Sequence, residues 1–207
     1  MEGGSFGIVS SSETSAPRRR TAAETRAHIL AVARELFYWQ GIRATGVDRV
    51  LAAADVAAPT LYRLWSSKDD LVVAYVAASA EGYRAWFDAA AAAGGEDARG
   101  QVLAVFAALD EQVQPHQCRG CPFLMALAEY PDPEHPVHRA AVAAKQWVAG
   151  RFAELATGYA KDHDGVDADA LAAHLVLLME GVYASVAALG VKGPARHARD
   201  VAAALLP

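Results

Sequence analysis

The stretch "VDRVLAAADVAAPTLYRLWSSKDDL", from Val47 to Leu71, decides the fold of the N-terminal third of the chain. Its apolar residues predict one short helix over 47–54 and a second over 58–64, with a tight turn between them at Asp55. Pro59 fits the first turn of the second helix, because the N–H that proline lacks has no partner there in any case. Two short helices joined in this way have the dimensions of a helix-turn-helix, whose second helix enters the major groove of DNA.

The second helix carries side chains suited to nucleic acid. Thr60 offers a hydroxyl to a base or phosphate and a methyl group to thymine, while Tyr62 and Lys68 suit phosphates. The DNA contacts predicted from this region are Thr45, Arg49, Ala58, Pro59, Thr60, Tyr62, Arg63 and Lys68. The alternative is a generic helical corner in which Tyr62 is half buried.

The charge distribution favours the same part of the chain. The net charge of the 207 residues is −5, which disfavours indiscriminate binding of polyanions. Residues 18–70 nevertheless hold nine Lys or Arg against six Asp or Glu, whereas residues 71–207 hold ten against sixteen. This asymmetry indicates a nucleic-acid partner for the first part alone. The cluster Arg18–Arg20 is either a minor-groove arm or a solvated tail.

The remaining sequence predicts an all-α protein of about nine helices. Helical spacing of apolar residues also occurs over 22–40, 67–86, 96–114, 121–130, 136–161, 167–189 and 194–206. We expect a disordered basic tail (1–21), a three-helix DNA-binding domain with the helix-turn-helix (22–70), and a larger helical domain for ligand binding and dimerisation (71–207). No apolar run reaches the roughly 20 residues of a membrane span, and the N-terminus lacks a secretory pattern. The expectation is a cytoplasmic protein without a membrane partner.

The stretch "HILAVARELFYWQGIRATGVDRVLAAADVAAPTLYRLWSSKDDL" (28–71) strongly resembles the DNA-binding domain of the TetR (tetracycline repressor) family. The matching residues are Leu36, Phe37, Gly41, Thr45, Val47, Val50, Ala53, Ala54, Val56, Thr60, Leu61, Tyr62, Ser67, Lys68 and Leu71. A looser resemblance joins "GCPFLMALAEYPDPEHPVHRAA" (120–141) to the C-terminal domain of one branch of that family. The resemblance implies a homodimeric repressor of palindromic double-stranded operator DNA, released when a small molecule binds the larger domain.

Several residues of the helix-turn-helix depart from the family pattern, among them Asp55 and Ala57. Asp55 stands where Gly is usual, and Asp adopts left-handed backbone geometry more readily than most residues. Ala57 replaces the Ser or Thr that caps the second helix, a loss of about 1 kcal/mol. We expect both changes to affect the position of the helix and its base preference rather than the fold.

Candidate residues in the larger domain follow from apolar spacing. Aromatic and Met side chains on helices with few charges predict a cavity for an apolar or aromatic effector, although such residues also form ordinary cores. The candidates are Trp86, Phe106, Phe123, Met125, Trp147, Arg151, Met179 and Tyr183. The last two helices are expected to form the dimer interface, through Leu175, Leu178, Val182, Val186 and Leu189. The small residues Gly181, Ala184, Ala187 and Ala188 would permit close approach.

The motif "CRGC" (118–121) supports a rival hypothesis. With His135 and His138 downstream, Cys118 and Cys121 have spacing compatible with tetrahedral zinc, and alone they suit a reversible disulfide. The simpler interpretation is two thiols near a helix terminus. The chain contains no nucleophile–base pair, phosphate loop or paired-carboxylate motif, so we expect neither an enzyme nor a cofactor or metal, and a redox- or metal-sensing helical protein remains the alternative.

Overall fold

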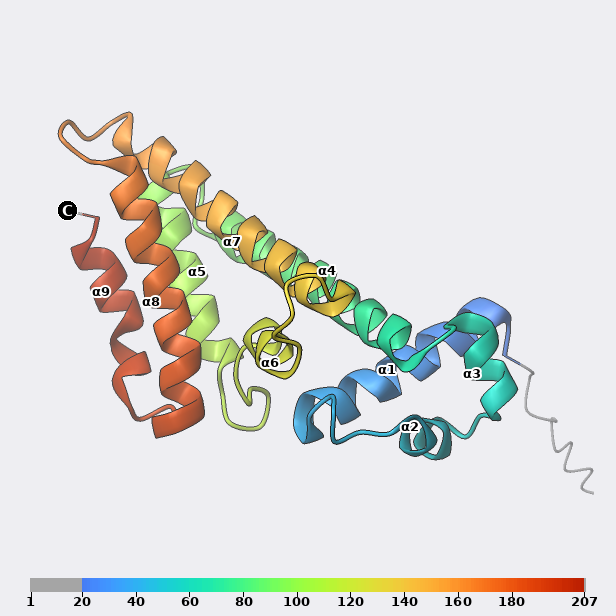
Figure 1. Ribbon diagram of the computed structural model, residues 1–207. Helices are drawn as coiled ribbons and strands as arrows, with labels where there is room; N and C mark the ends of the chain where they lie inside the picture. Colours follow the sequence, from blue (N-terminus) through green and yellow to red (C-terminus); the bar gives the residue numbers. More distant parts are fainter. Residues whose placement is uncertain (1–19, 207) are drawn as a thin grey trace, which may run out of the picture.

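The computed structural model describes residues 20–206, and this part of the chain is helical without strands (Figure 1). The predicted all-α class is confirmed. The helices are α1 (Ala22–Gln40), α2 (Val47–Ala54), α3 (Ala58–Leu64), α4 (Lys68–Ala93), α5 (Ala98–Gln112), α6 (Pro122–Glu129), α7 (Pro136–Ala160), α8 (Ala168–Leu189), the 3-10 helix η1 (Pro194–His197) and α9 (Ala198–Ala204). Arg20 is exposed, whereas Arg18 and Arg19 lie outside the described residues.

Most helices begin at a residue whose side chain caps them. Thr21 accepts a hydrogen bond from the backbone of Glu24, whose side chain bonds back to Thr21 in a capping box. Ser67, Asp97 and Asp167 cap α4, α5 and α8 by accepting hydrogen bonds from backbone N–H groups of the first turn, without the reciprocal bond. These local interactions explain why the helix boundaries are largely readable from the sequence.

Thr45, two residues before α2, does not cap this helix. The N-cap is Gly46, which makes no side-chain bond. Thr45 instead is fully buried, and its hydroxyl donates to the carbonyl oxygen of Gly41 at 2.8 Å. Its side chain therefore holds the turn after α1, where Gly41 adopts a φ of 94° that most residues avoid.

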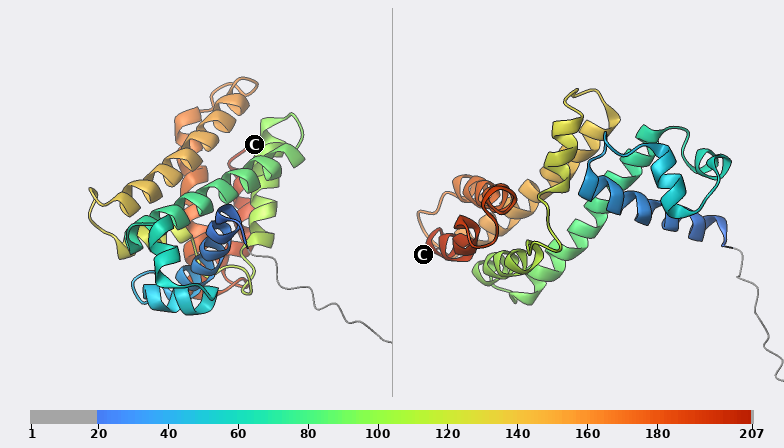
Figure 2. Two further views of the ribbon diagram at one scale, coloured as in Figure 1. Left: turned by 90° about the vertical axis from the view of Figure 1, so that its right-hand side faces the viewer. Right: turned by 90° about the horizontal axis from the view of Figure 1, so that it is seen from below.

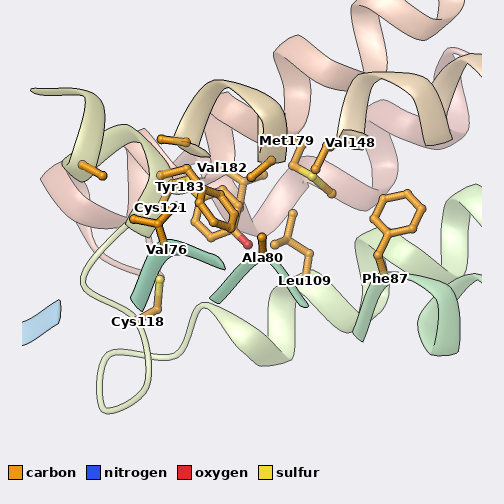
Figure 3. Packing of buried hydrophobic residues seen from close by; sticks show 14 of the residues in the cluster. Val76, Ala80, Phe87, Leu109, Cys118, Cys121, Val148, Met179, Val182 and Tyr183 are labelled. Atoms are coloured by element: carbon orange, nitrogen blue, oxygen red, sulfur yellow. The ribbon is translucent and has the colours of Figure 1, made fainter. Parts of the chain in front are cut away.

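The helices divide into two groups joined by α4. Helices α1–α3 gather at one end, α4 leads away from them with α7 alongside, and α8 and α9 lie at the opposite end (Figure 1; Figure 2, right). In the second group, α7 packs on α8, α4 packs on α5 and α7, and α5 packs on α9. Figure 3 shows part of this packing, in which Met179 and Tyr183 of α8 meet Ala80 of α4 and Leu109 of α5.

Direct contacts also tie α1 to the second group. The Glu129 carboxylate at the end of α6 accepts hydrogen bonds from the backbone N–H groups of Ile42 and Arg43, at 2.9 and 2.6 Å. The Tyr38 hydroxyl donates to the carbonyl of Gly120 at 2.9 Å and accepts from the N–H of Arg119 at 2.7 Å. The C-terminal end of α1 is therefore held at two points by α6 and by the loop that precedes it.

Among the described helices, α8 alone has the length and apolar composition that a membrane crossing requires. Seven of its residues are buried within the protein, including Leu171, Leu175 and Met179. One face of α8 therefore packs within the second group of helices.

Candidate nucleic-acid interface and effector cavity

The turn between α2 and α3 has the geometry that the sequence predicts. Asp55 adopts a left-handed conformation with a φ of 51° and ends α2. The N–H of Val56 then bonds to the carbonyl of Leu51 at 3.2 Å, which closes the turn. Ala57 is the N-cap of α3 and offers no side-chain acceptor, as expected from its missing hydroxyl.

Helix α3 is anchored by one face and leaves the other open. Leu61 and Trp65 are buried, and the Arg26 guanidinium of α1 lies 4.5 Å from the centre of the Trp65 ring. Arg26 also donates to the carbonyl of Leu64 at 3.3 Å, so it braces the end of α3. The sequence analysis missed this role, because the stacking partner lies 39 positions further along the chain. Tyr62, the next residue along α3, is 51% exposed.

Seven of the eight predicted DNA contacts are accessible. Thr60 and Lys68 are partly buried, and the other five are exposed: Arg49, Ala58, Pro59, Tyr62 and Arg63. Thr45 is the exception, since its buried hydroxyl is already bonded within the turn. We therefore withdraw Thr45 as a DNA contact and assign it a structural role.

A cavity of about 460 Å³ lies between the two groups of helices. Helix α1 lines it with Arg34, Glu35, Tyr38 and Trp39, and α4 lines it with Tyr75, Ser79, Gly82, Tyr83 and Trp86. The α5–α6 segment and α8 complete the wall with Gln112, His116, Gln117, Cys118, Gly120, Pro122 and Tyr183. The volume falls within the range of about 300–1,000 Å³ typical of small-molecule sites.

A chain of neutral polar groups occupies the inner wall of the cavity. The Tyr183 hydroxyl donates to the Gln112 side-chain oxygen at 2.6 Å and lies 3.5 Å from the Tyr83 hydroxyl. Burial raises the pKa of both Tyr83 and Tyr183 above the ordinary value of a phenol. Both phenols are therefore uncharged at neutral pH.

The predicted effector residues separate into two groups. Trp86 and Tyr183 line this cavity, whereas Phe106, Phe123 and Met179 are buried in the hydrophobic core and do not line it. The remaining three also lie outside it: Met125 is partly buried, Trp147 packs edge-on against Phe87, and Arg151 pairs with Asp88 and Glu154. A helical stripe of apolar residues cannot distinguish a core position from a cavity position, which explains why the predicted set contains both.

The lining also includes aromatic residues that the sequence analysis did not select. Tyr38 and Trp39 belong to α1, within the stretch assigned to DNA binding, and Tyr75 and Tyr83 follow on α4. Adjacent aromatics at the end of α1, beyond its buried stripe of Ile29, Ala33 and Phe37, were the available signal.

A second cavity of about 330 Å³ lies between α5 and the C-terminal helices. Phe106 and Val182 contribute to it, but its rim carries Asp110, Arg196 and Asp200 among other charged residues. Its lining therefore lacks the aromatic character of the first cavity.

The residues predicted for the dimer interface are mostly used within the protomer. Leu175, Val182 and Val186 are buried and Leu178 is partly buried, so only Leu189 is exposed, at 64%. The exposed apolar face of α8 is instead the one bearing Leu177, which is 68% exposed. Gly181, Ala184 and Ala188 share that face at helical spacing and are exposed as well.

The Cys118 and Cys121 thiols are free and buried. Burial raises the pKa of Cys121, against the opposing effect of Lys145, whose ammonium lies 3.8 Å from the sulfur. His135 and His138 are engaged elsewhere, with Asp69 and with the carbonyl of Tyr130. Within the described residues, no group of three or more His, Cys, Asp or Glu is arranged to hold a metal ion.

An anchored, outward-facing second helix and a separate helical body with a cavity define a helix-turn-helix DNA-binding regulator. Residues 29–75 match the family described as "Bacterial regulatory proteins, tetR family", and residues 99–202 match the "Tetracyclin repressor-like, C-terminal domain". The chain belongs to the TetR family. It is a ligand-responsive DNA-binding transcriptional regulator, and the redox or metal alternative is not favoured.

Individual relatives agree with this assignment. The structure of SCO4454, a TetR-family transcriptional regulator from Streptomyces coelicolor, is 38% identical, covers 89% of this chain and 95% of its own, and superimposes with a TM-score of 0.82. The structure of a putative TetR transcriptional regulator from Streptomyces avermitilis is 26% identical, covers 86% of this chain and 98% of that protein's chain, and has a TM-score of 0.69. The HTH-type transcriptional regulator YjdC of Escherichia coli K12 is 28% identical over 156 residues, which are 75% of this chain and 80% of that protein.

Proposed function

We propose that the protein is a cytoplasmic repressor that binds a palindromic operator as a homodimer and is released by a small apolar or aromatic effector. The observation that carries the proposal is α3, whose inner face is fixed by Leu61 and Trp65 while Tyr62 and Arg63 face solvent. In this proposal, residues 22–70 bind DNA, and residues 71–207 bind the effector and the second protomer.

The DNA contacts divide by chemistry. Thr60 lies in the first turn of α3, where it reads base edges, with Ala58 and Pro59 allowing close approach of the backbone. Tyr62, Lys68 and Arg49 bind phosphates, because a phenol, an ammonium and a guanidinium all donate hydrogen bonds to phosphate oxygens. Lys68 is the first residue of α4, so its charge adds to the positive end of a 26-residue helix.

The exposed face of α8 forms the proposed dimer interface. Leu177 provides an apolar anchor, while Gly181 and Ala184 let the backbones of two α8 helices approach closely. Val201 on α9 is also an exposed apolar side chain. A two-fold pairing through these helices places two copies of α3 on one DNA duplex.

The experiment that tests the proposal is footprinting on DNA flanking the protein's own gene. The expected result is a protected site with two symmetric halves about 34 Å apart, as two recognition helices on successive major grooves require. Arg63→Ala should weaken protection, whereas the matched control Arg139→Ala, an exposed arginine on α7, should leave it unchanged. Protection of a single unpaired half-site, or equal loss in both variants, would contradict the proposal.

A further inference from the structure

The first cavity spans the two groups of helices. Tyr38 and Trp39 of α1 form one wall, Tyr83 and Trp86 of α4 a second, and Tyr183 of α8 a third. Since α1 supports the helix-turn-helix and α8 belongs to the other group, a molecule that fills this space touches both. A molecule in a site lined only by residues of α4–α9 would not contact α1.

The charge of the lining selects against ionised ligands. Tyr75, Ser79 and Tyr183 are buried and uncharged, whereas the charged residues Arg34 and Glu35 are exposed and of opposite sign. An ionised group carried inward would lose its water without gaining a buried counter-charge, which is unfavourable. The aromatic walls favour a flat ring system, because aromatic pairs stack or meet edge to face.

The polar groups of the inner wall favour a ligand with one hydrogen-bonding substituent. The Gln112 oxygen already accepts the Tyr183 hydroxyl, which leaves the amide N–H groups of Gln112 as donors. A carbonyl or hydroxyl oxygen on the ligand is a suitable acceptor for them. The polar chain would then orient the molecule while the aromatic walls supply contact area.

The position of Tyr38 links this site to the helix-turn-helix. Its hydroxyl joins α1 to the backbone of Arg119 and Gly120, and its ring lines the cavity. A ligand pressed against Tyr38 and its neighbour Trp39 therefore acts on one of the two points that hold α1. The second point, Glu129, lies at the end of α6.

We infer that this cavity binds an uncharged, planar aromatic molecule bearing a carbonyl or hydroxyl group, and that the bound molecule contacts α1 directly. The link to DNA release rests on the proposed function. The site itself does not, because ligand binding is measured on the free protein.

The probe is 6-propionyl-2-dimethylaminonaphthalene, a neutral fluorescent naphthalene with a carbonyl group. Gly82 lines the cavity and is exposed, and a Cβ added there meets nothing within 4 Å, so the backbone accepts a side chain at this position. We expect the ring of Gly82→Phe to occupy part of the cavity. Gly150→Phe is the matched control, since Gly150 is also helical, exposed and uncrowded but lies outside the cavity. We expect Gly82→Phe to weaken probe binding by about tenfold or more and Gly150→Phe to leave it unchanged. Failure of the wild type to bind the probe, or equal binding in both variants, overturns the inference.

Contact with α1 is tested separately. Trp39→Ala should weaken probe binding about two- to twelvefold, the equivalent of one aromatic contact of about 0.5–1.5 kcal/mol. Gln40→Ala, the next exposed residue of α1 and not part of the lining, should have no effect. A probe lost from Gly82→Phe but bound normally by Trp39→Ala would overturn the claim that the ligand reaches α1.

The charge preference and the link to DNA complete the test. The anionic analogue 2-anilinonaphthalene-6-sulfonate should bind at least about tenfold more weakly than the neutral probe, because a buried sulfonate lacks a partner. Equal or tighter binding of the sulfonate overturns the ligand class.

Saturating neutral probe should also weaken operator binding in the wild type but not in Gly82→Phe. An unchanged operator affinity overturns the link, whereas a wild type that binds no operator refutes the proposed function alone.

Discussion

At the scale of single residues, the helix-turn-helix depends on a few side chains with distinct tasks. Asp55 supplies the left-handed turn, Leu61 and Trp65 fix α3 from within, and Arg26 braces its end. Tyr62 is left free of this packing and is half exposed. Because different side chains hold the fold and face solvent, substitutions can separate effects on stability from effects on DNA binding.

Ala57→Ser should stabilise the protein. Ala57 is the N-cap of α3 and makes no side-chain bond. A serine hydroxyl at this position would accept a hydrogen bond from the N–H of Thr60, which otherwise donates only to the carbonyl of Ala57, at 2.9 Å. The expected gain in the free energy of unfolding is about 0.5–1 kcal/mol by chemical denaturation. Ala52→Ser is the control, since Ala52 is exposed in the interior of α2 and cannot cap it. A loss of stability in Ala57→Ser would show that α3 does not begin where the structure places it.

Thr60→Val should reduce the preference for specific sequences. The substitution keeps the shape and the methyl group but removes the hydroxyl that reads a base edge. We expect affinity for the operator to fall by about 1 kcal/mol while affinity for random DNA changes little. Competition between the operator and a random duplex measures the ratio of the two affinities. An equal loss of affinity for both DNAs would indicate that Thr60 contacts phosphate instead of a base.

At the scale of helices, much of the fold was predictable from the sequence. The bounds of α2 and α3 agree with the predicted ranges 47–54 and 58–64, because the turn at Asp55 and Pro59 of α3 mark them locally. The use of each helix face was less predictable. The apolar stripe of α8 through Leu175 and Val182 packs inside the protomer, and the exposed stripe is made of small residues around Leu177.

This reassignment of α8 changes the test of dimerisation. Leu177→Glu places a charge on the exposed face, where it costs little in a monomer but would be desolvated in a dimer, at about several kcal/mol. Sedimentation should therefore show a folded monomer with weaker operator binding. Leu124→Glu on α6 is the matched control, because Leu124 is also partly exposed. A dimer that persists in Leu177→Glu would remove this face of α8 from the interface.

The cavity was the least predictable feature. Tyr38 and Tyr183 are 145 positions apart in the chain, and their placement on one cavity depends on how α1 docks against α4 and the α5–α6 segment. No local pattern encodes that docking. The sequence identified Trp86 and Tyr183 of the lining but assigned Trp147 to it as well, although Trp147 packs against Phe87.

At the scale of the whole molecule, the two groups of helices are joined by α4 and by polar contacts at the end of α1. Glu129→Gln removes the charge that accepts the N–H groups of Ile42 and Arg43. We expect a loss of about 1–2 kcal/mol in the free energy of unfolding, and hence a melting temperature lower by several degrees. Glu134→Gln, at an exposed surface pair with Arg139, should be nearly neutral. Equal melting temperatures for the two variants would show that Glu129 does not join the groups.

The central claim is that α3 and the start of α4 bind operator DNA, and its most direct test is the salt dependence of binding to the footprinted duplex. The binding titration is repeated over a series of salt concentrations for the wild type, for the double variant Tyr62→Phe with Lys68→Ala, and for the control Lys161→Ala. Lys161 is an exposed lysine at the C-terminal end of α7. The account predicts that the double variant binds more weakly and that its plot of log affinity against log salt is flatter by about one unit per protomer, while the control matches wild type. A folded double variant with wild-type affinity and slope would contradict the account.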